Sequence, residues 1–251
     1  MLERTFIHLP AVGAKRELAI WRAGIRDWRD FLARGEERLA PMIYRLGRPV
    51  VQRSLEALGR PDAAAVLAQM IPAAEHWRMW PRFGRVVFLD IETGGDPAEW
   101  GGVTVVGLYD GQRVAQLVAD HNMWLINDCM KGYDVVVTFS GASFDIPVLK
   151  QNFPLAYIPP IHIDLRWCLK RLGYQGGLKR IEKQLGINRP DHLKNLDGYQ
   201  AIKLWQAHQA GDPQALSTLL AYNAEDIINL KPLLELSAAQ LGSRLRNQAR
   251  D

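Results

Sequence analysis

A predicted strand of this chain ends on two carboxylates. In the segment RVVFLDIETGG, a run of β-forming residues leads directly into Asp90 and Glu92. Because successive side chains of a strand point to opposite faces, these two carboxylates project from the same face. Neighbouring carboxylates repel each other and resist burial unless a cation neutralises them. The pair alone is a weak signal, and by itself it favours a strand that simply runs into a water-exposed loop.

Two later segments add further acids. Asp145 lies in TFSGASFDIP, just beyond a predicted strand at 135–139, and Tyr222 and Asp226 lie in YNAED on the last predicted helix. At positions i and i+4, Tyr222 and Asp226 share one face of that helix. The candidate catalytic set is therefore four carboxylates, with a tyrosine one helical turn before the last.

Phosphodiester hydrolysis is the reaction that suits this set. The attacking water must lose a proton and the leaving alkoxide must be stabilised. Two divalent cations about 3.5–4 Å apart do both, and hard cations such as Mg²⁺ or Mn²⁺ prefer carboxylate oxygens. A phenol can orient the water, although at a pKa of about 10 it is a poor base without the help of a metal-bound water.

The elements that must position these residues change character along the chain. Apolar residues at three- and four-residue spacing predict helices in the N-terminal third. We expect them at 16–32, interrupted at Gly24 and capped again at Asp27, then at 36–58, and at 62–75 with Asp62 as the cap.

From Arg85 onward, strands alternate with helices. Strands are predicted at 85–91, 102–109, 112–118, 133–140 and 161–165, with a helix at 122–131 and mostly helices after 165. This order predicts an α/β fold, a mixed sheet flanked by helices. We expect two domains, a helical N-terminal region at 1–81 and the α/β domain at 82–251.

Composition bounds the class of protein. The chain has 251 residues and a net charge of +4, and the first 82 residues hold 14 Lys and Arg against nine Asp and Glu. Arginine favours planar partners such as phosphate, although a GC-rich genome also produces arginine-rich chains. No apolar run is long enough to span a membrane, and the first residues lack the apolar core of a signal peptide. Cys129 and Cys168 are expected as small buried residues in a reducing cytosol, which predicts a cytoplasmic protein.

The three acidic segments resemble the motifs of a known enzyme family. FLDIET, FSGASFDIP and YNAED are similar to the three motifs of the DEDD exonucleases on the RNase H-like fold, in the tyrosine subclass. The resemblance is strongest to the YprB-like branch, through TFIHLPAVGAKRELAIWRAGIRDWRDFL, HIDLRW, LKRIEKQLGI and LLAYNAEDIINLKPLL. It covers the chain from Thr5 to about Leu236.

The resemblance implies a five-stranded mixed sheet and 3′-to-5′ hydrolysis of single-stranded DNA or RNA. It assigns two divalent cations, Mg²⁺ or Mn²⁺, to Asp90, Glu92, Asp145 and Asp226, and the attacking water to Tyr222. The residues expected to contact substrate are Ile91, Thr93, Ser140 and Phe144. Many family members have Asn where this chain has Ser140. The shorter serine side chain puts the rate of hydrolysis and the affinity for substrate in doubt. A core aromatic explains Phe144 equally well.

Other charged residues receive simpler interpretations. Asp164 ends another apolar stretch and is as well explained by a helix cap as by a fifth metal ligand. Glu225 is expected to be solvated, and Lys179, Arg180 and Lys183 are expected on a solvated helix face. The alternative for a few of these cations is a place along the path of the strand, because backbone phosphates need scattered positive partners. Two other functions remain open, a structure-directed endonuclease on the same fold and a non-catalytic nucleic-acid-binding module. Circular single strands distinguish the first from an exonuclease, and metal-dependent hydrolysis excludes the second.

Overall fold

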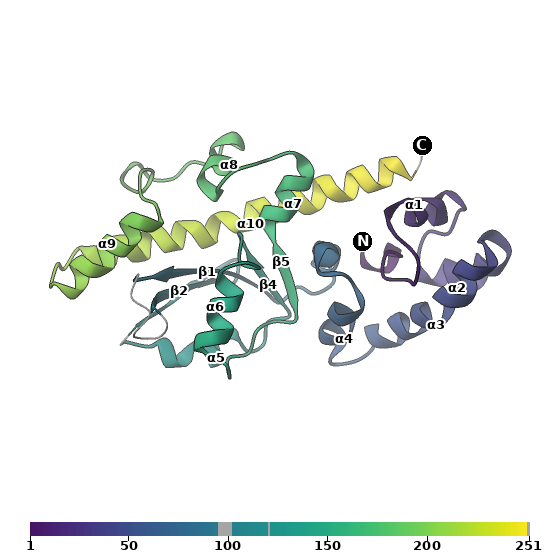
Figure 1. Cartoon of the computed structure of the whole chain (residues 1–251), viewed down its shortest axis with the longest axis horizontal. Coiled ribbons are helices and arrows are strands. Elements are labelled where there is room, and N and C mark those ends of the chain that lie inside the picture. Colours follow the sequence, from purple (N-terminus) through teal and green to yellow (C-terminus); the bar gives the residue numbers. More distant parts are fainter. Residues whose placement is uncertain (95–101, 120, 250–251) are drawn as a thin grey trace. The chain divides into compact units, whose positions relative to one another are not determined.

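The computed structural model describes residues 1–94, 102–119 and 121–249 of the chain (Figure 1). These residues form two compact units, one of Met1–Gly84 with Ala238–Asp251 and the other of Arg85–Ser237. The domain boundary expected between residues 81 and 82 stays a prediction. Within the described residues, no helix combines the length and the apolar character that crossing a membrane requires.

The second unit is built on a five-stranded mixed sheet, as the sequence predicted. Its strands are β1 (Val86–Thr93), β2 (Val103–Tyr109), β3 (Val114–Val118), β4 (Val135–Thr138) and β5 (Ile161–Asp164). The order across the sheet is β3-β2-β1-β4-β5. β1 pairs antiparallel with β2 and parallel with β4, and it therefore joins the two halves of the sheet. The acidic end of β1 lies at the centre of the sheet for this reason.

Helices flank this sheet. They are α5 (Ile126–Met130), α6 (Asp145–Asn152), α7 (Leu165–Leu172), α8 (Leu178–Gln184), α9 (Gly198–Gln209) and α10 (Ala215–Gln248), with short 3₁₀ helices at Met123–Leu125 and Asp191–Leu193 (Figure 1). Leu89 and Ile91 of β1 pack in one core with Ile146 and Leu149 of α6. On the opposite face of β1, Asp90 contacts Asn223 of α10. Burial on both faces explains why β1 reads as an almost continuous apolar run.

The first unit is helical, with α1 (Ala14–Arg22), α2 (Trp28–Arg38), α3 (Pro41–Leu58), α4 (Ala63–Met70) and 3₁₀ turns at Leu2–Arg4 and Ala73–Arg78. Asp27 caps α2 by accepting from the backbone N–H groups of Arg29 and Asp30. The continuous helix expected at 36–58 is wrong, because the chain breaks before Pro41, whose ring excludes helical geometry from the preceding residue. Asp62 makes no capping bond and instead binds Arg60.

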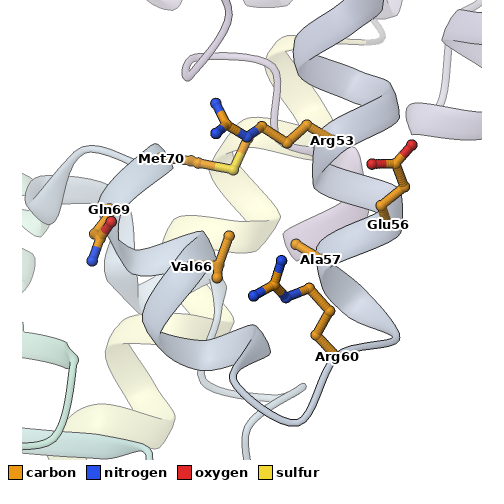
Figure 2. A pocket seen from close by; sticks show the side chains of 7 residues that line it. All are labelled: Arg53, Glu56, Ala57, Arg60, Val66, Gln69 and Met70. Carbon is orange, nitrogen blue, oxygen red and sulfur yellow. The ribbon is translucent and has the colours of Figure 1, made fainter.

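Several N-terminal arginines are neutralised within the first unit. Arg78 is buried and forms ion pairs with Glu17 at 2.8 Å and Glu75 at 2.5 Å. Arg53 and Arg60 line a groove of about 510 Å³ between α3 and α4, together with Glu56 and apolar side chains (Figure 2). Arg60 forms an ion pair with Asp62, which does not line the groove, and Glu56 adds a negative charge to the lining. The net charge of the groove is therefore small. The basic excess of this region is therefore partly structural.

Candidate active site

The end of β1 and the middle of α10 bring three of the predicted acids together. Asp90, Glu92 and Asp226 each offer a carboxylate oxygen, and these oxygens lie within 4.8 Å of one another. Glu92 and Asp226 are buried, and Asp90 is half-buried. The pairing of β1 with β2 changes register between Glu92 and Thr93, and such irregularities commonly re-aim side chains beside active sites.

Asp145, the fourth predicted acid, stands next to this trio but outside it. It is the first residue of α6, is buried, and accepts a hydrogen bond of 3.2 Å from the backbone N–H of Ile91. Ile91 lies between Asp90 and Glu92 in β1, so this bond holds the Asp145 carboxylate beside the trio. The structure thus gathers all four acids, with Asp145 already engaged by the backbone of β1.

The four carboxylates are costly to ionise together. Burial is the main cause that raises the pKa of Asp90 well above its usual value, followed by the charges of Asp226, Glu92 and Asp145. Burial and then Asp226 raise the pKa of Glu92 to about 8. Burial also raises the pKa of Asp145 to about 7 and that of Asp226 above its usual range. A cation between them would remove this penalty.

Tyr222 lies one helical turn before Asp226 and is buried among the same acids. Burial, and after it the charges of Asp226, Glu92 and Asp90, raise the pKa of its phenol. The phenol is therefore protonated throughout the physiological pH range. The Lys179 ammonium lies 4.4 Å from the centre of the Tyr222 ring.

Arg189, a residue that the sequence did not point to, holds Asp226. The guanidinium of Arg189 donates to both oxygens of Glu182, each at 2.6 Å, and its Nη2 also forms an ion pair with Asp226. Asn229 of α10 donates to Glu182 at 3.1 Å. This network joins α8 to α10, and the charge of Arg189 lowers the pKa of Asp226 against the effect of burial.

Asn223 orients the carboxylate of Asp90. It is fully buried, and its Nδ2 donates to Asp90 Oδ2 at 3.2 Å. Gln116 of β3 donates to Asn223 Oδ1 at 3.0 Å and so fixes the amide. The amide fits only because β2 has Gly107 opposite Asp90, where a Cβ would lie 2.1 Å from Asn223 Oδ1. The position of Asn223 inside YNAED was the only signal in the sequence.

Asp164 shapes the loop that leads to Asp145. Its carboxylate accepts from the backbone N–H groups of Ser140 at 2.9 Å, Ala142 at 3.1 Å and Arg166 at 3.0 Å. With these bonds Asp164 caps the following helix and anchors the loop. It is not one of the three acids whose oxygens lie close enough together to bind a metal ion. Ser140 has a left-handed backbone with φ of 67°, a conformation that asparagine tolerates better than serine.

The predicted substrate residues surround the end of β1. Ile91 is buried and contributes its backbone N–H to Asp145, whereas Thr93 is half-buried. The side chain of Phe144 is 47% exposed, so the alternative of a core aromatic is wrong for it. Their contact with substrate stays a prediction.

The prediction of a solvated helix face is wrong for Lys179. Arg180 and Lys183 are exposed as expected. The Nζ atom of Lys179, in contrast, is buried and has no hydrogen-bond partner among the described residues.

The donor set fits divalent cations. Glu92 Oε1 is buried and accepts no hydrogen bond within the described part of the chain. A buried carboxylate oxygen without a donor is costly unless a cation takes the place of the donor. The four acids provide only oxygen donors, which suits Mg²⁺ or Mn²⁺ rather than a soft metal ion.

Comparison with known proteins identifies the domain. A model of the RNase H superfamily matches residues 87–238. Similar solved structures include the family B DNA polymerase from the hyperthermophilic archaeon Pyrobaculum calidifontis, with 18% identity and a TM-score of 0.49 over 66% of this chain and 27% of that chain. A second is the apo form of a nuclease, with 20% identity and a TM-score of 0.45 over 72% of this chain and 83% of that chain. A third is Escherichia coli RNase D, an exoribonuclease involved in structured RNA processing, with 16% identity and a TM-score of 0.45 over 76% of this chain and 48% of that chain. No curated protein matches the sequence.

Proposed function

The chain belongs to the RNase H superfamily, and from this premise we propose that it is a divalent-metal-dependent 3′-to-5′ exonuclease acting on single-stranded nucleic-acid ends. The observation that carries the proposal is the trio of Asp90, Glu92 and Asp226, buried or half-buried, whose oxygens lie within 4.8 Å of one another. Tyr222 and Asp145 at the same place support membership of the tyrosine subclass of DEDD exonucleases, in the YprB-like branch.

In this proposal the acids bind the metal ions, and two neighbouring residues hold the acids in place. Asp90, Glu92, Asp145 and Asp226 would hold two Mg²⁺ or Mn²⁺ ions, which supply an activated water and stabilise the leaving oxygen. Asn223 keeps the Asp90 carboxylate aimed at this site through its bond of 3.2 Å. Arg189 fixes Asp226 and offsets part of its charge, so that the four acids remain together before substrate arrives.

Tyr222 orients the attacking water rather than removing its proton. Burial and the charge of Asp226 raise the pKa of the phenol, which keeps its O–H group available as a hydrogen-bond donor or acceptor at neutral pH. The backbone from Ile91 to Thr93 and the exposed ring of Phe144 would receive the last nucleotide of the strand. An unpaired end reaches such a recessed site more readily than a duplex does.

The test is degradation of 5′-labelled single-stranded DNA and RNA with Mn²⁺ or Mg²⁺. We expect a ladder that shortens from the 3′ end, no products with Asp90→Ala, and a rate roughly 10²- to 10⁴-fold lower with Tyr222→Phe. Glu225→Gln is the matched control, because it changes a partly exposed acid next to Asp226 and should keep full activity.

Two results would contradict the proposal. Cleavage of circular single strands by the wild type would indicate an endonuclease. Binding of both polymers without any metal-dependent hydrolysis would indicate a non-catalytic nucleic-acid-binding module. A cytoplasmic location remains part of the proposal, and cell fractionation tests it.

A further inference from the structure

A cationic cavity of about 400 Å³ lies between α8 and the segment that follows it. Its lining residues are Lys179, Glu182, Lys183, Ile187, Asn188, Arg189, Lys194 and Asn195. Four cations face one carboxylate, and that carboxylate, Glu182, is already bound by Arg189 and Asn229. The volume is in the range of small-ligand sites, and the excess of positive charge selects an anion.

Two of the cations have buried nitrogen atoms without partners. Lys179 Nζ and Arg189 Nη1 are both buried and lack a hydrogen-bond partner among the described residues. The Arg189 side chain is only 4% exposed, and its other nitrogens are held by Glu182 and Asp226. These bonds fix the plane of the guanidinium and therefore the direction in which the Nη1 atom, at its free edge, can donate. Leaving a buried charged donor unsatisfied is costly, so both atoms indicate a ligand with acceptor oxygens.

The same two residues connect the cavity to the candidate active site. The Nζ atom of Lys179 lies 4.4 Å from the centre of the Tyr222 ring. Arg189 forms an ion pair with Asp226. The cavity therefore adjoins the candidate active site through these two side chains.

The remaining cations differ in availability. Lys194 is bound to Asp191 at 2.5 Å, which neutralises much of its charge. Lys183 is exposed on α8 and turns toward the same cavity. The side-chain amides of Asn188 and Asn195 add donors that can reach phosphate oxygens.

We propose that this cavity binds a backbone phosphate of the nucleic-acid strand, adjacent to the scissile phosphodiester, through Lys179, Lys183 and the free edge of Arg189. The proposal rests on the proposed function in taking a single strand as the ligand. Binding itself requires neither metal nor hydrolysis, which allows the two claims to be tested separately.

The experiment measures binding of a short, fluorescently labelled single-stranded DNA by anisotropy in EDTA, over a series of salt concentrations. Lys179→Met keeps the aliphatic stem over Tyr222 and removes the charge, and Lys183→Ala removes an exposed charge that the fold does not need. We expect each variant to bind roughly tenfold more weakly. The slope of log K against log salt should fall by about 0.7 for each lost phosphate contact.

Lys203→Met is the matched control. Lys203 lies 4.5 Å from the centre of the Tyr199 ring on α9 and does not line the cavity. It therefore reproduces the lysine–tyrosine contact without the pocket, and we expect affinity equal to the wild type. Circular dichroism of every variant verifies that the fold is kept.

The outcomes separate the two claims. Unchanged affinity and salt slope in Lys179→Met and Lys183→Ala would overturn the cavity proposal even if the wild type hydrolyses DNA. Loss of affinity in both variants would support it even if the wild type shows no hydrolysis at all. Inorganic phosphate is titrated at constant ionic strength, and its own binding is followed by calorimetry. Phosphate that binds the wild type but not Lys179→Met, and that leaves the affinity for the strand unchanged, would assign the cavity to a free anion and overturn the strand assignment.

Discussion

Replacing Glu92 with Gln should stabilise the metal-free protein at alkaline pH. Glu92 is buried, and burial followed by the charge of Asp226 raises its pKa from 4.5 to about 8. Between these two values the unfolded chain has released the proton, whereas the folded chain retains it. The folded state then binds more protons, so stability falls as pH rises through this interval. The contribution of the protonated Glu92 to stability is lost in full above about pH 8.

The size of the effect follows from the same interval. About 3.5 pH units at about 1.36 kcal/mol per unit set an upper limit of about 5 kcal/mol. Glu92 shares this repulsion with Asp226 and Asp145, so part of the energy belongs to its neighbours. We therefore expect Glu92→Gln to add about 2–3 kcal/mol to the free energy of opening at pH 8.5 and little at pH 4.5.

Hydrogen exchange of the β1 amides, Val86–Thr93, is the suitable measurement because it reports on the second unit alone. Rates are compared in EDTA and in Mn²⁺, with intrinsic rates corrected for pH. Mn²⁺ should restore protection to the wild type at pH 8.5 by binding the carboxylates, and should do so much less in Glu92→Gln. Glu225→Gln again serves as the control.

Two results would refute this reasoning. The first is wild-type protection in EDTA that stays constant or increases between pH 4.5 and 8.5. The second is a Glu92→Gln protein that opens more easily than the wild type at pH 8.5. Either result would mean that the four acids are not held together against their own repulsion.

Two further substitutions test how the site is supported. Asn223→Ala should lower the metal affinity and slow hydrolysis, because Asp90 and Gln116 both lose a hydrogen-bond partner. Calorimetric titration measures the metal affinity, and urea unfolding should show a loss of about 1–3 kcal/mol in stability. Unchanged metal affinity would count against an orienting role. Ser140→Asn should raise stability by roughly 0.5–1 kcal/mol, since φ of 67° suits asparagine better; a lower melting temperature would show that the serine hydroxyl matters more than the backbone.

Local patterns pointed to the three acids that the structure brings together, Asp90, Glu92 and Asp226. The apolar run of β1 ends on Asp90 and Glu92, and the period of two places both carboxylates on one face. The helical spacing of Tyr222 and Asp226 likewise needs no tertiary information. Five strands and the mixed sheet followed from the alternation of strands with helices, and the structure confirmed them.

The supporting residues could not be predicted because their partners are distant in the sequence. Arg189 meets Asp226 across 37 positions, and Asn223 meets Asp90 across 133. Lys179 has the spacing of a surface lysine, and only the packing of α8 against α10 buries its Nζ atom. Neither periodicity nor composition contains this information.

The close approach of α10 to β2 makes two distant positions depend on each other. At Gly107 any Cβ would overlap the amide of Asn223, so the strand and the helix share one fixed volume. Among related sequences, a larger residue at position 107 is therefore expected only together with a smaller one at position 223. Such paired variation would leave Asp90 without its amide partner, and these relatives would need another donor to hold that carboxylate.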